Sequence, residues 1–180
     1  KIPEHSNSPE TFLLMADVDV YIREITKLMK IRLSPSQDHG VYLTFNKPAH
    51  SLAPLFECVD HKSTILFLDA VSNHMGLAAD SKIENAFFIS NPQDLTQLTI
   101  ALNRVLKMHE FALIFVDSMP SMLQYNDNQT SGHFLHAISA ICQQNGVDLV
   151  IMANPSLPEA VKASIMALSP QEIKTGALET

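Results

Sequence analysis

Short runs of apolar and β-branched residues recur along the chain, and stretches with helical periodicity separate them. Six of these runs are predicted strands: residues 11–16, 40–45, 64–68, 86–90, 112–116 and 148–153. The runs are continuously apolar, which is typical of strands buried on both faces of a parallel sheet. This alternation of strands and helices predicts an α/β domain with a mostly parallel central sheet flanked by helices.

Capping and breaking residues mark where the helices are expected to begin and end. Residues 91–94 (Asn-Pro-Gln-Asp) predict a helix start, because Asn caps, Pro suits the first turn and Asp complements the helix dipole. Thr130 or Ser131 is expected to cap the next long helix, and Gly146 to end it in a left-handed conformation. Residues 156–159 (Ser-Leu-Pro-Glu) have the spacing of a capping box for the last helix.

The length and composition fit one globular domain. A chain of 180 residues buries roughly 70% of its unfolded surface, and 46% hydrophobic with 17% charged residues suits a packed core. No apolar run reaches the roughly 18 residues that a membrane helix needs, so a cytoplasmic location is expected. Residues 1–170 are expected to form the domain, and residues 171–180 a flexible C-terminal tail.

The charge pattern argues against nucleic acid as a partner. The net charge is −7, and the twelve Lys and Arg residues are scattered instead of forming a basic stripe. Arg23, Lys27 and Lys30 share one face of a predicted helix, where a solvated surface is expected. Cys58 and Cys142 lie in apolar helical patterns without a CxxC spacing, so they are expected to be buried thiols and not metal or redox ligands.

Four segments carry a resemblance to a known family, and they occur in the order that this family has. Residues 111–118 (Phe-Ala-Leu-Ile-Phe-Val-Asp-Ser) form an apolar run ending in Asp-Ser, and residues 40–45 (Gly-Val-Tyr-Leu-Thr-Phe) precede it. Residues 91–96 and 146–153 supply the lead-in and the next strand. Over residues 11 to about 155 the chain resembles the KaiC-like branch of the RecA superfamily, which is widespread in archaea. The resemblance implies a three-layer RecA-like (P-loop NTPase-type) fold.

In that family the carboxylate at the tip of the Walker B strand holds the magnesium of MgATP, usually through a water. The resemblance therefore makes Asp117 and Ser118 candidates for a relic magnesium site or a weak nucleotide site. The competing hypothesis is structural, and it is the favoured one. It has Asp117 capping a neighbouring loop or helix at the end of its strand.

The chain departs from the family where the family holds phosphate. Active members follow the first strand with Gly-x-x-x-x-Gly-Lys-Ser/Thr, whose backbone amides cradle phosphates. Here no glycine follows the first strand, and Asp17 and Asp19 would repel an anion. Residues 46–48 (Asn-Lys-Pro) follow the second strand, where active members carry acidic residues. The Walker A loop is thus degenerate, and a pseudo-ATPase without catalytic residues, resident metal or cofactor is expected, with ATP and magnesium held at most weakly.

Other groups of residues suggest less specific chemistry. Lys47 and His50 lie at a strand-to-helix junction and are weak candidates for an anion site, against a plain connection capped by Ser51. His133 and His136 are three apart on a predicted helix, where surface histidines are favoured over metal ligands.

Two further patterns follow the Walker-B-like strand. Residues 117–120 (Asp-Ser-Met-Pro) distantly resemble the phosphorylated segment of response-regulator receivers, with the spacing one residue short. Met119, Met122 and Leu123 form either an exposed apolar patch or a cover over the core.

The leading functional hypothesis is a non-catalytic RecA/KaiC-like domain that acts as a regulatory or protein-interaction module. A protein partner or self-association is expected, because RecA-type domains commonly assemble side by side. The alternative is a nucleotide or small-molecule sensor that uses the crevice at the carboxyl end of the sheet. A divergent ATPase is the third hypothesis.

Overall fold

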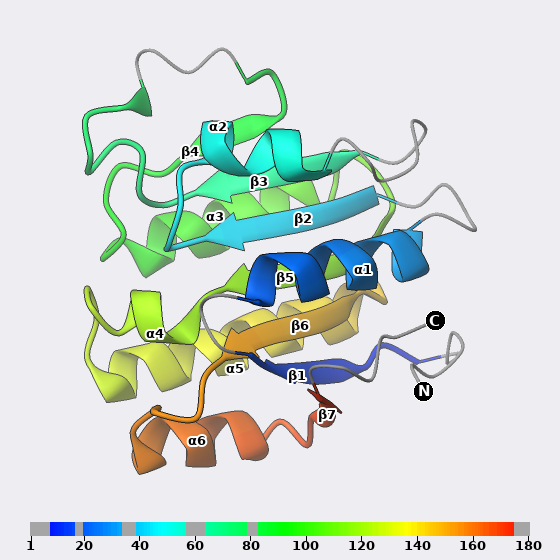
Figure 1. The fold of residues 1–180 in the computed structure, drawn as a ribbon, viewed down its shortest axis with the longest axis vertical. Helices are drawn as coiled ribbons and strands as arrows, with labels where there is room; N and C mark the ends of the chain where they lie inside the picture. Colours follow the sequence, from blue (N-terminus) through cyan, green and yellow to red (C-terminus); the bar gives the residue numbers. More distant parts are fainter. Residues whose placement is uncertain (1–7, 17–19, 34–38, 57–63, 79–82, 175–180) are drawn as a thin grey trace.

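The computed structural model describes residues 8–16, 20–33, 39–56, 64–78 and 83–174. Within them, seven strands form one sheet in the order β4-β3-β2-β5-β6-β1-β7, and every described pairing is parallel (Figure 1). The strands are β1 (Thr11–Met15), β2 (His39–Thr44), β3 (Ile65–Asp69), β4 (Ala86–Phe88), β5 (Phe111–Asp117), β6 (Asp148–Ala153) and β7 (Gln171–Lys174).

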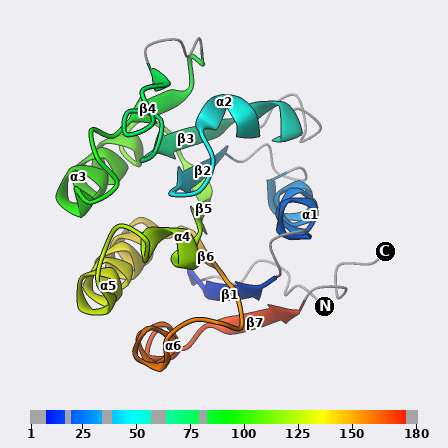
Figure 2. The same ribbon diagram turned by 60° about the vertical axis from the view of Figure 1, so that its left-hand side comes forward.

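Helices cover both faces of this sheet and complete a three-layer α/β fold (Figure 2). They are α1 (Tyr21–Leu33), α2 (Ala49–Leu52), the 3-10 helix η1 (Ala53–Phe56), α3 (Leu95–Val105), α4 (Met119–Met122), α5 (Asn128–Asn145) and α6 (Glu159–Met166). α1 and α2 pack on one face, and α3, α5 and α6 pack on the other. None of the helices among the described residues is long and apolar enough to cross a membrane.

The two hydrophobic clusters explain why the strands are continuously apolar. Along β6, Leu149 and Ile151 belong to the cluster beneath α3, α5 and α6, whereas Val150 and Met152 belong to the one beneath α1 and α2. Both sets are buried, because the sheet has a helical layer on each side. The prediction of a parallel sheet covered on both faces is confirmed, and the strand predicted at residues 64–68 is β3, which is buried along its whole length.

The position of β1 rules out the receiver-like hypothesis. β1 lies between β6 and β7, and its residues Thr11–Met15 pair with residues 149–153. A receiver has the flavodoxin-like strand order 2-1-3-4-5, in which the first strand lies beside the second. Here β2 lies instead between β3 and β5.

The segment after Pro170 differs from the flexible tail expected at residues 171–180. Residues 171–174 form β7, which pairs with β1 in parallel at the edge of the sheet. Its one apolar side chain, Ile173, is buried in the cluster beneath α1. A single apolar residue in Gln-Glu-Ile-Lys leaves no periodic signal, so only tertiary packing identifies this strand. Residues 175–180 lie outside the described part of the chain.

Helix caps also differ in place from those expected. Asp94 caps α3 by accepting a hydrogen bond from the Gln97 amide at 2.8 Å, so the helix begins after the 91–94 segment. Asp127, and neither Thr130 nor Ser131, caps α5. Each Asp carboxylate reaches the amide three residues ahead, which is the usual N-cap geometry.

The last helix does not use the predicted capping box. α6 begins at Glu159 after Pro158, and no side chain caps it. The prediction for the end of α5 is confirmed, because Gly146 adopts a left-handed conformation with φ of 70°.

Several surface and core predictions have clear outcomes. Arg23 and Lys30 are exposed on α1, while His133 and His136 are exposed on α5. The Met119 and Met122 side chains are fully buried, so the segment after β5 covers the core and is not an exposed patch. Cys142 is a buried free thiol, and burial raises its pKa to about 12; Cys58 lies outside the described residues.

Candidate functional site

Three adjacent strands end in polar residues at the same level of the sheet. The pairing places Thr44 of β2 between Asp69 of β3 and Asp117 of β5. All three side chains are fully buried. Because the carboxyl ends of parallel strands are where open α/β folds place ligands, this row is the candidate site that the fold defines.

Asp117 is buried beside a tyrosine from the neighbouring strand. The Tyr42 hydroxyl donates a hydrogen bond of 2.7 Å to Oδ2 of Asp117, while the ring of Tyr42 stacks on Phe115 at 5.2 Å. Oδ1 of Asp117 is buried without a hydrogen-bond partner among the described residues. Burial raises the pKa of Asp117 to about 6, although the Tyr42 hydrogen bond, the nearby Asn46 side-chain amide and the Lys47 charge lower it in part.

The first residue of α1 lies near this carboxylate. Tyr21 is buried, and its hydroxyl accepts a hydrogen bond of 2.8 Å from the Asn46 side-chain amide. Burial and the Asp117 charge together raise the pKa of Tyr21 far above its usual range. Lys47 lies over the Tyr21 ring, with its Nζ 5.8 Å from the ring centroid. Tyr21, Tyr42 and Asn46 thus occupy the surroundings of Asp117.

Asp69 is the second buried carboxylate of the row, and both of its oxygens accept hydrogen bonds within the protein. It accepts hydrogen bonds from the Ala49, Val71 and Ser72 amides at 2.6, 2.9 and 2.8 Å, and from the Ser72 hydroxyl at 2.6 Å. Asp69 therefore joins the start of α2 to the loop after β3. An apolar run ending in Asp is the signal that singled out Asp117, and the same signal would have found Asp69.

The two anion-site candidates lie at the junction that Asp69 caps. The first amide of α2, which an incoming anion would need, already donates to the Asp69 carboxylate. Lys47 and His50 are exposed on either side of this junction. Pro48, and not Ser51, precedes the helix as its cap residue. Only Lys47 approaches the Asp117 group, where its positive charge lowers the carboxyl pKa.

Ser118 performs the capping role that was expected of Asp117. Its hydroxyl oxygen accepts the Ser121 amide hydrogen bond at 3.4 Å and starts α4, and its hydroxyl lies 3.0 Å from that of Ser121. Within the described part of the chain, the Asp117 carboxylate accepts its hydrogen bond from the Tyr42 side chain and none from a helix or loop amide. The peptide bond between Asp117 and Ser118 is cis.

The loop where the family carries its phosphate-binding glycines lies only partly within the described residues. Residues 17–19, with Asp17 and Asp19, are outside them. Ala16 is buried, and its amide donates to the Ala153 carbonyl at 3.1 Å. In the described part of the chain, no group of three or more His, Cys, Asp or Glu side chains is arranged to hold a metal ion.

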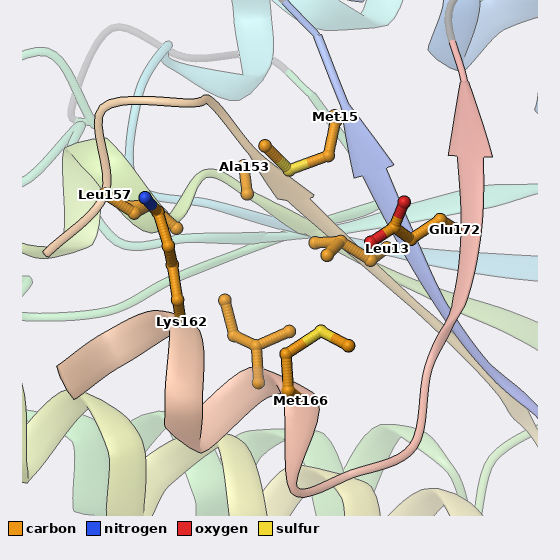
Figure 3. Close-up of a pocket in the computed structure, with 8 residues that line it drawn as sticks. Leu13, Met15, Ala153, Leu157, Lys162, Met166 and Glu172 are labelled. Carbon is orange, nitrogen blue, oxygen red and sulfur yellow. The ribbon is translucent and has the colours of Figure 1, made fainter. Parts of the chain in front are cut away.

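A cavity of about 220 Å³ lies on the other face of β1, between α6 and the strands β1, β6 and β7 (Figure 3). Its walls are mostly apolar. The residues that line it are Leu13, Met15, Ala153, Leu157, Lys162, Ile165, Met166 and Glu172. Met15 and Ala153 are the last residues of β1 and β6, so the cavity lies near the carboxyl end of the sheet. No sequence pattern pointed to it.

Comparison with known proteins supports the fold. No protein-family model matches the chain, and no curated protein matches it either. Among solved structures, the chain is similar to a KaiC-like protein from the hyperthermophilic archaeon Pyrococcus horikoshii OT3. The TM-score is 0.56 at 14% identity, over 88% of this chain and 68% of that one. Together with the parallel sheet between two helical layers, this similarity identifies a three-layer RecA-like α/β fold.

Proposed function

We propose that this protein is a non-catalytic RecA/KaiC-like domain that has lost ATP hydrolysis and acts as a regulatory or protein-interaction module. The observation that carries the proposal is the burial of Asp117. This residue matches the magnesium-holding carboxylate of the family by sequence. Its side chain is 0% exposed, and Tyr42 donates a hydrogen bond to it.

The surroundings of Asp117 argue against binding of MgATP there. Magnesium keeps several waters and usually binds one or two carboxylates together with substrate phosphates, which needs open space. Tyr21 stands at the start of α1, and its buried side chain lies close enough to Asp117 for the Asp117 charge to raise the Tyr21 pKa, after burial as the larger cause. Asn46 lies two residues after β2; its side-chain amide donates to Tyr21 and supplies no carboxylate to orient a water.

Exposed apolar side chains support the interaction role. Phe87 of the edge strand β4 is 42% exposed, and Met75 and Leu77 in the connection before it are 51% and 39% exposed. Exposed apolar residues near a sheet edge are typical of surfaces that contact another chain. A protein partner or a second copy of the chain is the occupant that this proposal expects. Sedimentation velocity over a range of concentrations tests the second copy directly.

Thermal melts with nucleotides test the loss of the ATP site. The protein is heated with millimolar ATP, ADP or GTP, each with and without magnesium. A ligand present at a hundredfold excess over its dissociation constant stabilises the fold by about 2.7 kcal/mol, which is easily detected. The expected result is an unchanged midpoint with every nucleotide.

The variant Asp117→Ala shows whether a shift in these melts comes from nucleotide binding at Asp117. A magnesium-dependent shift that disappears in Asp117→Ala would contradict the proposal and revive the divergent-ATPase hypothesis, as would turnover abolished by the same variant. Glu110→Ala is the matched control, because Glu110 is exposed at the opposite end of β5. A shift retained in both variants would place nucleotide binding away from Asp117.

One observation favours the alternative of a small-molecule sensor, namely the cavity beside α6. It lies near the carboxyl ends of β1 and β6, the end of the sheet where such a sensor is expected to bind. Its apolar lining suits a small organic molecule better than a nucleoside triphosphate. The two hypotheses are compatible in one domain, since Asp117 and the cavity lie on opposite faces of the sheet.

A further inference from the structure

The charges around the cavity beside α6 are not balanced. Lys162 and Glu172 are its two charged lining residues. The Lys162 ammonium lies 2.8 Å from the carboxylate of Glu159, one turn earlier on α6, so its charge is already compensated. Glu172 has no ion-pair partner among the described side chains, and in Figure 3 its carboxylate points toward Leu13 on the strand side of the cavity. Among the side chains that the structure describes, one negative charge is therefore left without a partner at the edge of an apolar space.

The size and walls of the cavity limit what it can hold. An engineered cavity of about 150 Å³ lined by aliphatic side chains binds benzene. At about 220 Å³ this cavity has room for an aromatic ring with a short chain. The thioethers of Met15 and Met166 contribute to opposite walls, and methionine sulfur makes favourable contacts with aromatic rings.

We propose that this cavity binds a small primary amine whose aromatic or short alkyl body fills the apolar space and whose ammonium group faces Glu172. The proposal deepens the small-molecule sensor alternative by naming a ligand class, and it does not depend on the loss of ATP hydrolysis. A carboxylic acid of the same shape fits less well. It would face the Glu172 carboxylate, and it would compete with Glu159 for the Lys162 ammonium.

The strength of binding follows from these features. Glu172 is exposed to solvent, so its attraction for an ammonium group is screened and contributes about a two- to fivefold preference over a neutral ligand. The apolar contacts of a ligand of this size give dissociation constants of about a millimolar. The expected order of affinity is amine, then neutral alcohol, then acid.

The chain carries its own reporters for the test. Its eight methionines can be labelled with ¹³C at the methyl group and followed by NMR. Met15 and Met166 line the cavity, Met29 and Met119 are buried elsewhere, and Met75 is exposed in the β3–β4 connection. Titration with phenethylamine is expected to shift the Met15 and Met166 signals in a saturable manner and to leave Met29, Met119 and Met75 unmoved. Its shape analogues 2-phenylethanol and 3-phenylpropionate complete the ligand set.

Charge variants show whether Glu172 recognises the ammonium. Glu172→Gln is expected to weaken phenethylamine binding about two- to fivefold and to leave 2-phenylethanol binding unchanged. Glu172→Lys is expected to reverse the preference between the amine and the acid. Both changes are at an exposed position, so the fold is expected to survive. Glu110→Gln, at the amino end of β5, is the control and is expected to bind like the unaltered chain.

Several results would overturn the proposal. They are the absence of saturable shifts at Met15 and Met166, equal shifts at the exposed Met75, equal affinity for amine and acid, or unchanged amine binding in Glu172→Gln. The nucleotide melts concern Asp117 on the other face of the sheet. Failure of this proposal is therefore distinguishable from failure of the pseudo-ATPase proposal.

Discussion

The Tyr42 hydroxyl and the Asp117 carboxylate form a buried hydrogen bond of 2.7 Å between the adjacent strands β2 and β5. Tyr42 lies in the middle of β2, whereas Asp117 is the last residue of β5. The tyrosine side chain therefore extends along the sheet to reach the carboxylate. The ring of Tyr42 is held over Phe115 and contacts Phe67, which fixes where its hydroxyl lies. The remaining oxygen of Asp117 has no partner among the described residues.

Tyr42→Phe is expected to destabilise the fold, because it removes the one described side-chain hydrogen bond to Asp117. Hydrogen bonds to charged groups contribute about 1.5–3 kcal/mol, roughly twice those between neutral groups. The cost is therefore expected to be about 2 kcal/mol at pH 8 and about half that near pH 5, where Asp117 is mostly protonated. Urea unfolding at the two pH values measures it. Tyr125→Phe is the control, and an equal loss in both variants would contradict the interpretation.

Asp117→Asn is expected to remove a pH dependence of stability. Burial raises the folded-state pKa of Asp117 from 3.8 to about 6, so the folded protein binds this proton more tightly than the unfolded chain does. The stability that comes from this proton is fully present below about pH 4 and is lost as the pH rises through 6. The full change amounts to about 3 kcal/mol. Subtracting the Asp117→Asn curve from that of the unaltered protein between pH 4 and 8 isolates this group, and a flat difference would count against the raised pKa.

Asp69→Ala is expected to be among the most destabilising single changes at this end of the sheet. It leaves three backbone amides and the Ser72 hydroxyl without their acceptor in a buried region. Losses of about 3–5 kcal/mol are typical when a buried network of this kind is broken. Asp69→Asn keeps one acceptor oxygen and is expected to lose about half as much. Equal losses in the two variants, measured by chemical unfolding, would show that side-chain volume and not hydrogen bonding decides the cost.

The effect of Gly132→Ala is expected to depend on Ser164. A Cβ atom at Gly132 would lie 2.8 Å from the Ser164 hydroxyl oxygen, where α5 packs against α6. The added Cβ would also lie 3.3 Å from the Ser164 Cβ, so two contacts with this residue oppose the helix preference for alanine over glycine, which is about 1 kcal/mol. In a Ser164→Ala background only the 3.3 Å contact remains, and the same substitution is expected to cost about 1 kcal/mol less than in the unaltered chain. Additive effects in the four-variant cycle would contradict this coupling.

Ile173→Ala tests whether β7 belongs to the folded domain. The Ile173 side chain is 7% exposed and packs in the cluster beneath α1. Its truncation is expected to cost about 2–4 kcal/mol, as for other buried isoleucines. Glu172→Gln, one residue earlier and exposed, is expected to change stability by less than about 0.5 kcal/mol. A cost for Ile173→Ala as small as that of the control would mean that these residues form a tail after all.

The sequence predicted the layers of the fold better than its edges. Strands such as β5 and β6 are continuously apolar because helices cover both of their faces, and this local pattern survives in the sequence. β7 has one buried side chain and owes its conformation to pairing with β1, which lies far away in the sequence. Periodicity within a segment carries no information about such a partner.

The same limit explains why only part of the candidate site was predicted from the sequence. An apolar strand ending in Asp identified Asp117 from the sequence, and its position at the carboxyl end of β5 is confirmed. The roles of Tyr21 and Tyr42 depend on which strands and helices lie beside β5, and no local pattern states that. Whether Asp117 faces solvent or a tyrosine was therefore beyond what the residues around it reveal.

The position of β1 in the sheet affects how the chain folds during translation. Both neighbours of this first strand, β6 and β7, belong to the last part of the chain. A ribosome adding roughly 5–20 residues per second needs on the order of ten seconds to move from the end of β1 to the end of β6. During that interval β1 is a nascent apolar segment with neither of its hydrogen-bonding neighbours made. The edges of this apolar segment are therefore expected to stay unpaired until β6 has been synthesised.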